Sequence, residues 1–200
     1  MVIPRDVVIA LSLMIASAFI FILNETTLVV ALPVIMERFE VTAAAGQWLT
    51  TGFMLTLAVV IPTTGYLLQR LTTRQVFITS LSLFLSGSVL AAAAPTFWAL
   101  LAGRVVQASG TGLMLPLLMT SVMSLVPVQR RGAVMGLIGV VIAAAPALGP
   151  TVSGLILQTL GWRWVFSLMV PLGVASLVVG LVMVRNVGEV VRDRLDVPSV

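Results

Sequence analysis

Long apolar runs separated by short polar segments dominate the chain. Six runs are long enough to cross a bilayer, which takes about 20 residues of helix. Transmembrane β-strands alternate over about ten residues, and these runs do not. Because backbone groups in hydrocarbon must pair within the protein, the pattern predicts an all-α membrane protein. The predicted helices cover residues 7–32, 47–68, 76–94, 97–126, 133–157 and 164–184 of a transmembrane domain at 1–184, and 185–200 is predicted to be a cytoplasmic tail or linker.

Composition agrees with a lipid-facing surface. Of the residues, 60% are hydrophobic and 9% are charged, whereas soluble domains carry about 25% charged residues. The chain has no cysteine and no histidine, so disulfides, Cys or His metal sites and thiol or Ser-His catalysis are excluded. The few acidic residues are scattered. We therefore expect neither an enzyme nor a cofactor or metal, and, without a basic run, no nucleic-acid partner.

The basic residues predict the orientation. With a cytoplasmic N-terminus, the outer side holds only Arg38 and Arg163, whereas most arginines fall on the inner side, as the positive-inside rule requires. The inner set is Arg5, Arg70, Arg74, Arg130, Arg131, Arg185, Arg192 and Arg194. All four tryptophans fall at predicted outer helix ends, where indoles prefer the membrane interface. We expect both termini to be cytoplasmic. The first apolar run continues past a possible cleavage site at residues 16–18, so the first helix should be retained.

Two ionisable residues, Glu25 and Arg104, lie inside predicted helices. A charge at mid-helix costs at least ~2.5 kcal/mol on insertion scales, so both side chains should face protein or a watery cavity. Both lie roughly 10–12 Å from an expected outer helix end, at 1.5 Å per residue, and so at similar depth. Glu25 as a proton or cation site with Arg104 as a gating charge is one interpretation, and a structural ion pair is the other. Gln107, one turn from Arg104, should share its environment.

Three further features bear on mechanism. The fifth helix carries Pro146 and Pro150 among small residues, which suits either a sliding contact or a static, closely packed bundle. The short basic segment 65–74 is predicted to be a loop that makes the second and third helices antiparallel neighbours. In the first and fourth helices a charge precedes a proline, which suggests two inverted three-helix repeats.

Together these segments resemble the major facilitator superfamily, and within it the fourteen-helix drug:proton antiporters of the EmrB/QacA type. Five motifs occur in the expected order, and the match covers nearly the whole chain. They are LNETTLVVALP at 23–33, GYLLQRLTTR at 65–74, LAGRVVQASG at 101–110, APALGPTVSG at 145–154 and WRWVFSLMVP at 162–171.

The resemblance implies one six-helix bundle of a multi-pass transporter in the plasma or inner membrane of a bacterium, exchanging protons for small lipophilic or cationic compounds. It implies coupling roles for Asn24, Glu25, Arg104 and Gln107. Asn24 replaces the family's aspartate, so Glu25 takes over the acidic role only if geometry allows, because helical neighbours point about 100° apart. Gating roles fall to Gly65, Gln69, Arg70 and Arg74. Sliding roles fall to Pro146, Gly149, Pro150 and Gly154.

A single bundle leaves several possibilities for the assembly. The chain could be the N-terminal half or a truncated form that pairs with a missing C-terminal half, or a half-transporter active only as a dimer with a second copy. A non-transporting membrane scaffold or accessory subunit is the alternative from another class. An intramembrane lipid enzyme is disfavoured, because no nucleophile–base pair is present.

Overall fold

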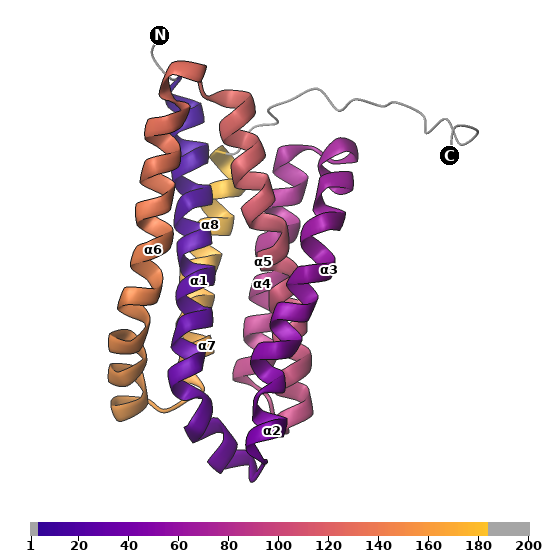
Figure 1. Cartoon of the computed structure of the whole chain (residues 1–200), viewed down its shortest axis with the longest axis vertical. Coiled ribbons are helices and arrows are strands. Elements are labelled where there is room, and N and C mark those ends of the chain that lie inside the picture. Colours follow the sequence, from indigo (N-terminus) through magenta and orange to yellow (C-terminus); the bar gives the residue numbers. More distant parts are fainter. Residues whose placement is uncertain (1–3, 184–200) are drawn as a thin grey trace, which may run out of the picture.

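The computed structural model describes residues 4–183, and in this part of the chain every regular element is a helix. Six helical stretches are long and apolar enough to cross a membrane, as predicted (Figure 1). The helices are α1 Arg5–Phe39, α2 Ala43–Gly46, α3 Trp48–Arg70, α4 Thr73–Ala92, α5 Phe97–Leu125, α6 Val128–Thr159, α7 Trp164–Ser167 and α8 Met169–Met183. The predicted tail at 185–200 lies outside the described residues.

Helix α1 continues well past the end expected at residue 32. Pro33 lies inside it, and the helix ends at Phe39, where Glu40 takes a left-handed conformation with φ 51°. Proline lacks a backbone N–H, but membrane helices tolerate it when neighbouring helices compensate. The expectation that Pro33 marks the helix end was therefore wrong.

The segment 65–74, predicted to be a loop, is mostly helical. Residues 65–70 form the last turns of α3, and α4 begins at Thr73, so only two residues connect the helices. Thr72 starts α4 with a capping box, in which its hydroxyl accepts from the Gln75 N–H and the Gln75 side chain accepts from the Thr72 N–H. Such a box satisfies two otherwise unpaired donors at a helix start. The two helices are antiparallel, as the short connection requires.

Helix α6 extends beyond its predicted span of 133–157, and the last span is divided. α6 begins at Val128, so its first turn carries the exposed Arg130 and the half-buried Arg131. Hydropathy alone excludes charged residues from a membrane span, which is why the predicted start was too late. The last span breaks at Leu168, which separates the short α7 from α8.

The helices pack in a pattern with internal two-fold character. α3 packs extensively on α5, and correspondingly α1 packs on α6, while α4 meets α8 and α1 meets α5. If the first, second and third spans are exchanged for the fourth, fifth and sixth, the α3–α5 contact becomes the α1–α6 contact, and the α4–α8 and α1–α5 contacts map onto themselves. The pattern fits two inverted three-helix repeats.

The closest helix approach joins α4 to α5, and it depends on glycine. A Cβ at Gly87 would lie 2.5 Å from the Gln107 backbone nitrogen, and one at Gly110 would lie 2.5 Å from the Ser80 carbonyl oxygen. Neither contact is tolerable, so these positions require glycine. This close approach brings the backbones of α4 and α5 together as in other small-residue membrane interfaces.

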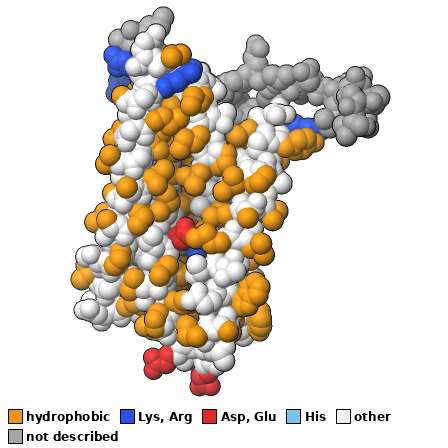
Figure 2. All heavy atoms as spheres, in the orientation of Figure 1, with side chains coloured by type: hydrophobic (Ala, Val, Ile, Leu, Met, Phe, Trp, Pro, Cys, Tyr) orange, Lys and Arg blue, Asp and Glu red, His pale blue; other side chains and the backbone are white. Residues whose placement is uncertain are grey.

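The bundle leaves two helices largely uncovered. The most apolar stretches of α3 and α6 are 11% and 17% buried, whereas that of α5 is 61% buried. Large apolar side chains such as Leu55 and Val59 on α3 and Val140 on α6 are exposed. Figure 2 shows such side chains spread over the face, with basic side chains near the N-terminal end. This surface is suited to lipid or to another apolar bundle.

Candidate functional site

A polar network lies inside the bundle, where α1, α4, α5 and α7 meet. Its centre is Arg104 of α5, which is 1% exposed, and its partners are Asn24, Gln107 and Ser88, each 0% exposed. A buried charge is expensive unless hydrogen bonds compensate it, so the location of this arginine dictates the polar side chains around it.

One guanidinium nitrogen makes both hydrogen bonds of Arg104. Its Nη1 donates to Asn24 Oδ1 at 3.2 Å and to Gln107 Oε1 at 2.9 Å. Nε is buried without a partner in the described part of the chain. The guanidinium carbon lies 4.1 Å from the ring centroid of Phe53 on α3, so an aromatic face supplies a further attraction. The charge thus has acceptors and a π-system around it but is not fully satisfied.

Asn24 connects three elements because an amide both accepts and donates. Its Oδ1 accepts from Arg104 and from Gln107 Nε2, the latter at 3.0 Å, and its Nδ2 donates to the Val165 carbonyl of α7 at 3.0 Å. Gln107 Nε2 also donates to Ser88 Oγ at 2.7 Å. An aspartate at position 24 would lack the donor that Val165 uses. The structure therefore brings together three of the four predicted coupling residues.

Glu25, the fourth predicted coupling residue, points to a different side of α1 and is half-buried. It attracts Arg104 electrostatically. Within residues 4–183, however, the hydrogen bonds of the Arg104 guanidinium go to Asn24 and Gln107 and not to the Glu25 carboxylate. A direct ion pair between the helices, one of the two interpretations from sequence, does not form. Figure 2 shows an acidic side chain beside a basic one at mid-height of the bundle. Glu25 is thus close enough to the buried network to interact with its charge and keeps part of its side chain exposed.

Sequence reasoning missed Phe53, Ser88 and the Val165 carbonyl. None has a signal in the sequence, because an isolated phenylalanine or serine in an apolar run resembles ordinary core. Their roles depend on tertiary contacts that place them around Arg104.

The predicted gating residues do not form one cluster. Arg70 stacks on Tyr66 of its own helix, with 4.6 Å between guanidinium carbon and ring centroid. Arg74 Nη2 donates to the Leu181 carbonyl near the end of α8 at 2.7 Å. Gly65 and Gln69 are exposed, and a Cβ at Gly65 would meet nothing within 4 Å. Arg74 thus ties α4 to α8, whereas the other three lie on the surface.

The motif at 145–154 on α6, to which the resemblance gave sliding roles, divides into a packed and an open part. A Cβ at Gly149 would collide with the side chain of Thr26 on α1, and Ser153 Oγ donates to the Thr27 carbonyl at 2.8 Å. Pro146 and Pro150 are exposed, and Gly154 has open space beside it. One side of the motif therefore attaches α6 to α1, and the other faces away from the bundle.

No group of three or more metal-ligating side chains occurs among the residues that the structure describes. What the network offers is a fixed positive charge with a carboxylate nearby. A carboxylate takes up or releases a proton, whereas the guanidinium stays charged. The arrangement can couple a protonation change at Glu25 to the field that surrounds Arg104.

Comparison with known proteins adds sequence relatives to this geometry. The family model described as Major Facilitator Superfamily matches residues 14–195. The lincomycin resistance protein LmrB of Bacillus subtilis is 47% identical over 192 residues, which are 96% of this chain and 40% of the relative. The uncharacterized MFS-type transporter YcnB of the same organism is 41% identical over 197 residues, covering 98% of this chain and 42% of the relative. A multidrug resistance protein B homolog of Mycobacterium tuberculosis is 35% identical over 160 residues, which are 80% of this chain and 30% of the relative.

Among solved structures, the crystal structure of the human organic anion transporter MFSD10 (TETRAN) shares the fold. Its TM-score is 0.77 at 17% sequence identity, and the match covers 94% of this chain and 49% of that one. The chain thus spans about two-fifths of the length of the first curated relatives it matches and half of the solved structure.

Proposed function

Because the chain belongs to the major facilitator superfamily, we propose that it is the N-terminal half of a proton-coupled drug efflux transporter in a bacterial cell membrane. The observation that carries the proposal is the buried guanidinium of Arg104, bound by Asn24 and Gln107, with Glu25 nearby but unpaired in the described chain. Intramembrane charges of this kind are costly and mark ion and substrate pathways. Bacterial relatives named for lincomycin and multidrug resistance support the substrate class.

Glu25 is the proton carrier in this mechanism. Protonated, it leaves Arg104 without a nearby negative charge, and deprotonated, it restores the attraction. A substrate with a positive charge and an apolar body competes with the proton for the same carboxylate, so the two alternate. The scheme yields exchange of protons for lipophilic or cationic compounds.

The weakly buried helices α3 and α6 supply the face toward a second bundle. With α1 and α5 they form one wall of a central cavity, and the open side of the α6 motif, including Pro146, Pro150 and Gly154, is the sliding surface. The second bundle is a C-terminal half or a second copy of the chain, and the whole is of the fourteen-helix EmrB/QacA type. The match covers 49% of the solved structure of similar fold, which supports a transporter made of two such bundles.

The proposed orientation places both termini in the cytoplasm. The described basic residues at helix ends on the N-terminal side of the bundle are Arg5, Arg70, Arg74, Arg130 and Arg131. The tryptophans lie at or next to the starts of helices α3, α5 and α7 at the opposite end. This distribution follows the positive-inside rule and the aromatic preference for interfaces.

The test is Glu25→Gln in the transporter reconstituted into liposomes, with Glu37→Gln as control. Glu37 is an exposed acid near the end of the same helix. We expect Glu25→Gln to reduce uptake of a cationic drug driven by a pH gradient to the level of protein-free liposomes, because the proton and the cation share this carboxylate. Exchange of an uncharged lipophilic drug should persist, because that drug does not need the carboxylate. Undiminished gradient-driven transport by Glu25→Gln, with normal insertion, would exclude Glu25 as the carrier.

A further inference from the structure

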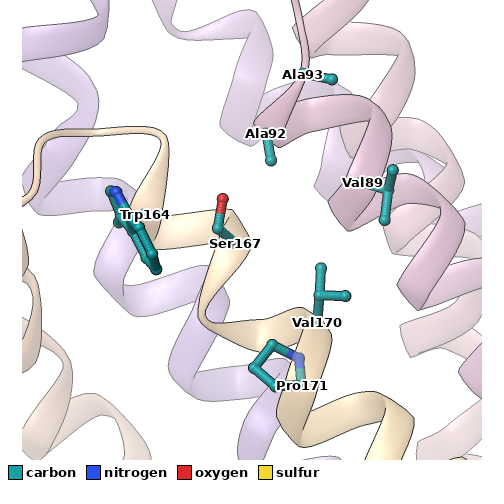
Figure 3. Close-up of a pocket in the computed structure, with 7 residues that line it drawn as sticks. All are labelled: Val89, Ala92, Ala93, Trp164, Ser167, Val170 and Pro171. Carbon is teal, nitrogen blue, oxygen red and sulfur yellow. The ribbon is translucent and has the colours of Figure 1, made fainter.

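An apolar hollow of about 540 Å³ lies between α4 and the α7–α8 segment (Figure 3). Val89 and Ala92 of α4 form one wall, and Trp164, Ser167 and Pro171 form the other. In Figure 3, Ala92 and Ser167 face each other across the hollow, with Trp164 at one side. Small side chains on α4 and the helix break at Leu168 leave space that no described residue fills.

The walls of the hollow favour an apolar guest. Ser167 carries the single hydroxyl among the described lining residues, and it donates to the carbonyl of Arg163, the N-cap residue of α7, at 3.1 Å. Val89 and Trp164 are 50% and 45% exposed. Both walls belong to membrane-spanning segments, so the hollow opens toward the hydrocarbon region at the tryptophan-bearing end. A polar ligand would find few hydrogen-bonding groups there, whereas a hydrocarbon chain needs none and keeps its apolar surface out of water.

A cation is fixed at the rim of this hollow. Arg163, next to Trp164, donates from Nη2 to the Ala94 carbonyl at 3.1 Å, and its guanidinium carbon lies 4.6 Å from the centroid of the Trp162 ring. Ala94 comes just after the α4 residues that line the hollow. The guanidinium is therefore held where both walls end, at the depth of the membrane interface. Within residues 4–183 no carboxylate lies within 4.0 Å of it, and a planar guanidinium suits phosphate oxygens.

We propose that this hollow binds an acyl chain of an anionic phospholipid whose phosphate pairs with Arg163. The apolar walls recognise the chain, and the rim cation recognises the headgroup. The phosphate of a zwitterionic lipid carries its own ammonium partner, so Arg163 selects lipids without one. The site involves α4, α7 and α8, and it is independent of the proposed transport chemistry around Glu25.

Brominated acyl chains quench tryptophan on contact, which gives a direct test. Two single-tryptophan proteins are compared, one keeping Trp164 (W48F, W98F and W162F) and one keeping Trp98 (W48F, W162F and W164F). Trp98 is 72% exposed and does not line the hollow. Each is titrated in bilayers with brominated phosphatidylglycerol or brominated phosphatidylcholine. We expect phosphatidylglycerol to quench Trp164 at about fivefold lower mole fraction, as one interfacial charge predicts, and Trp98 to show no preference.

Variants then separate the two parts of the site. Arg163→Gln should abolish the preference at Trp164, Arg163→Lys should retain part of it, and Ala92→Leu should lower quenching by both lipids by filling the hollow. Arg38→Gln, which changes an exposed arginine at the same end, should have no effect. Equal behaviour of Trp164 and Trp98 would overturn the proposal, because it means unselective boundary lipid only. So would shielding of Trp164 from both lipids in the longer transporter, because protein would then fill the hollow.

Discussion

At the scale of single residues, Asn24 connects the buried charge of Arg104 to the packing of α1 against α5 and α7. Its amide oxygen accepts from two donors on α5, and its amide nitrogen donates to one acceptor on α7. A carboxylate would attract Arg104 more strongly but would repel the Val165 carbonyl. Asn24 thus stabilises the bundle without adding a second negative charge, which leaves Glu25 as the residue whose protonation can vary.

Replacing Asn24 by leucine should destabilise the bundle. Arg104 and Gln107 would each lose an acceptor and Val165 would lose a donor, all in a buried site. We expect the free energy of unfolding to fall by about 2–4 kcal/mol, since hydrogen bonds to charged groups are among the stronger ones. The measurement is thermal or denaturant unfolding in detergent.

The control for this substitution is Ser86→Ala, which removes an exposed hydroxyl bonded only within its own helix, to the Leu83 carbonyl. It should change stability little. Equal stability of the wild type and Asn24→Leu would show that the network does not support the fold.

Which residues carry charge inside the membrane could be predicted from the sequence, because a single Glu or Arg in a long apolar run stands out. Their similar depth could be predicted as well, and the Asn24–Arg104 hydrogen bond places the two helices at the same level. That Asn24 and not Glu25 contacts Arg104 could not be predicted, since it depends on the rotation of α1. The contact of Phe53 with Arg104 could not be predicted either, because it depends on how α3 packs against α5.

At the scale of helices, apolar runs in the sequence locate the membrane spans better than they locate the ends of the helices. Helices α1 and α6 both extend beyond their apolar stretches by turns that carry charge, such as Glu37 and Arg38 on α1. Hydropathy reports where the chain meets hydrocarbon, whereas helix ends depend on caps and on the first residue with an unsuitable backbone. Glu40, in the left-handed region, provides that stop for α1.

The two glycines of the α6 motif should respond differently to alanine. Gly149→Ala forces α6 away from Thr26 of α1, and overpacking of this kind costs about 1–3 kcal/mol. Gly154→Ala meets open space and should be neutral or stabilising by up to about 1 kcal/mol, the difference in helix propensity. Unfolding of the purified chain measures both. A Gly154→Ala penalty as large as that of Gly149→Ala would mean that Gly154 is also packed.

At the scale of the molecule, the bundle combines a packed side and an open side. α5 is well covered, whereas α3 and α6 present apolar side chains outward. The helix count and an inverted-repeat plan could be predicted from hydropathy and resemblance. Which helices are exposed could not, because low hydrophobic asymmetry along membrane helices hides their buried faces.

Cysteine labelling should separate a cavity face from a lipid face, and the chain has no native cysteine to interfere. Leu55→Cys on α3 and Val178→Cys on α8 replace residues that are 59% and 56% exposed. In the transporter with its second bundle, a water-soluble maleimide should react with position 55, because thiolate forms only in water. Position 178 should stay unlabelled. Equal labelling of the two would contradict a watery cavity at α3.

The Phe53 ring over Arg104 constrains how this half of the molecule can move. Helix α3 has most of its contacts with α5, and one of them covers a buried cation with an aromatic face at 4.1 Å. Pulling the two helices apart would remove that aromatic contact from the charge and leave it only its hydrogen bonds to Asn24 and Gln107. We therefore expect α3 and α5 to move together when the bundle rocks, and bending to occur at positions such as the break between α7 and α8.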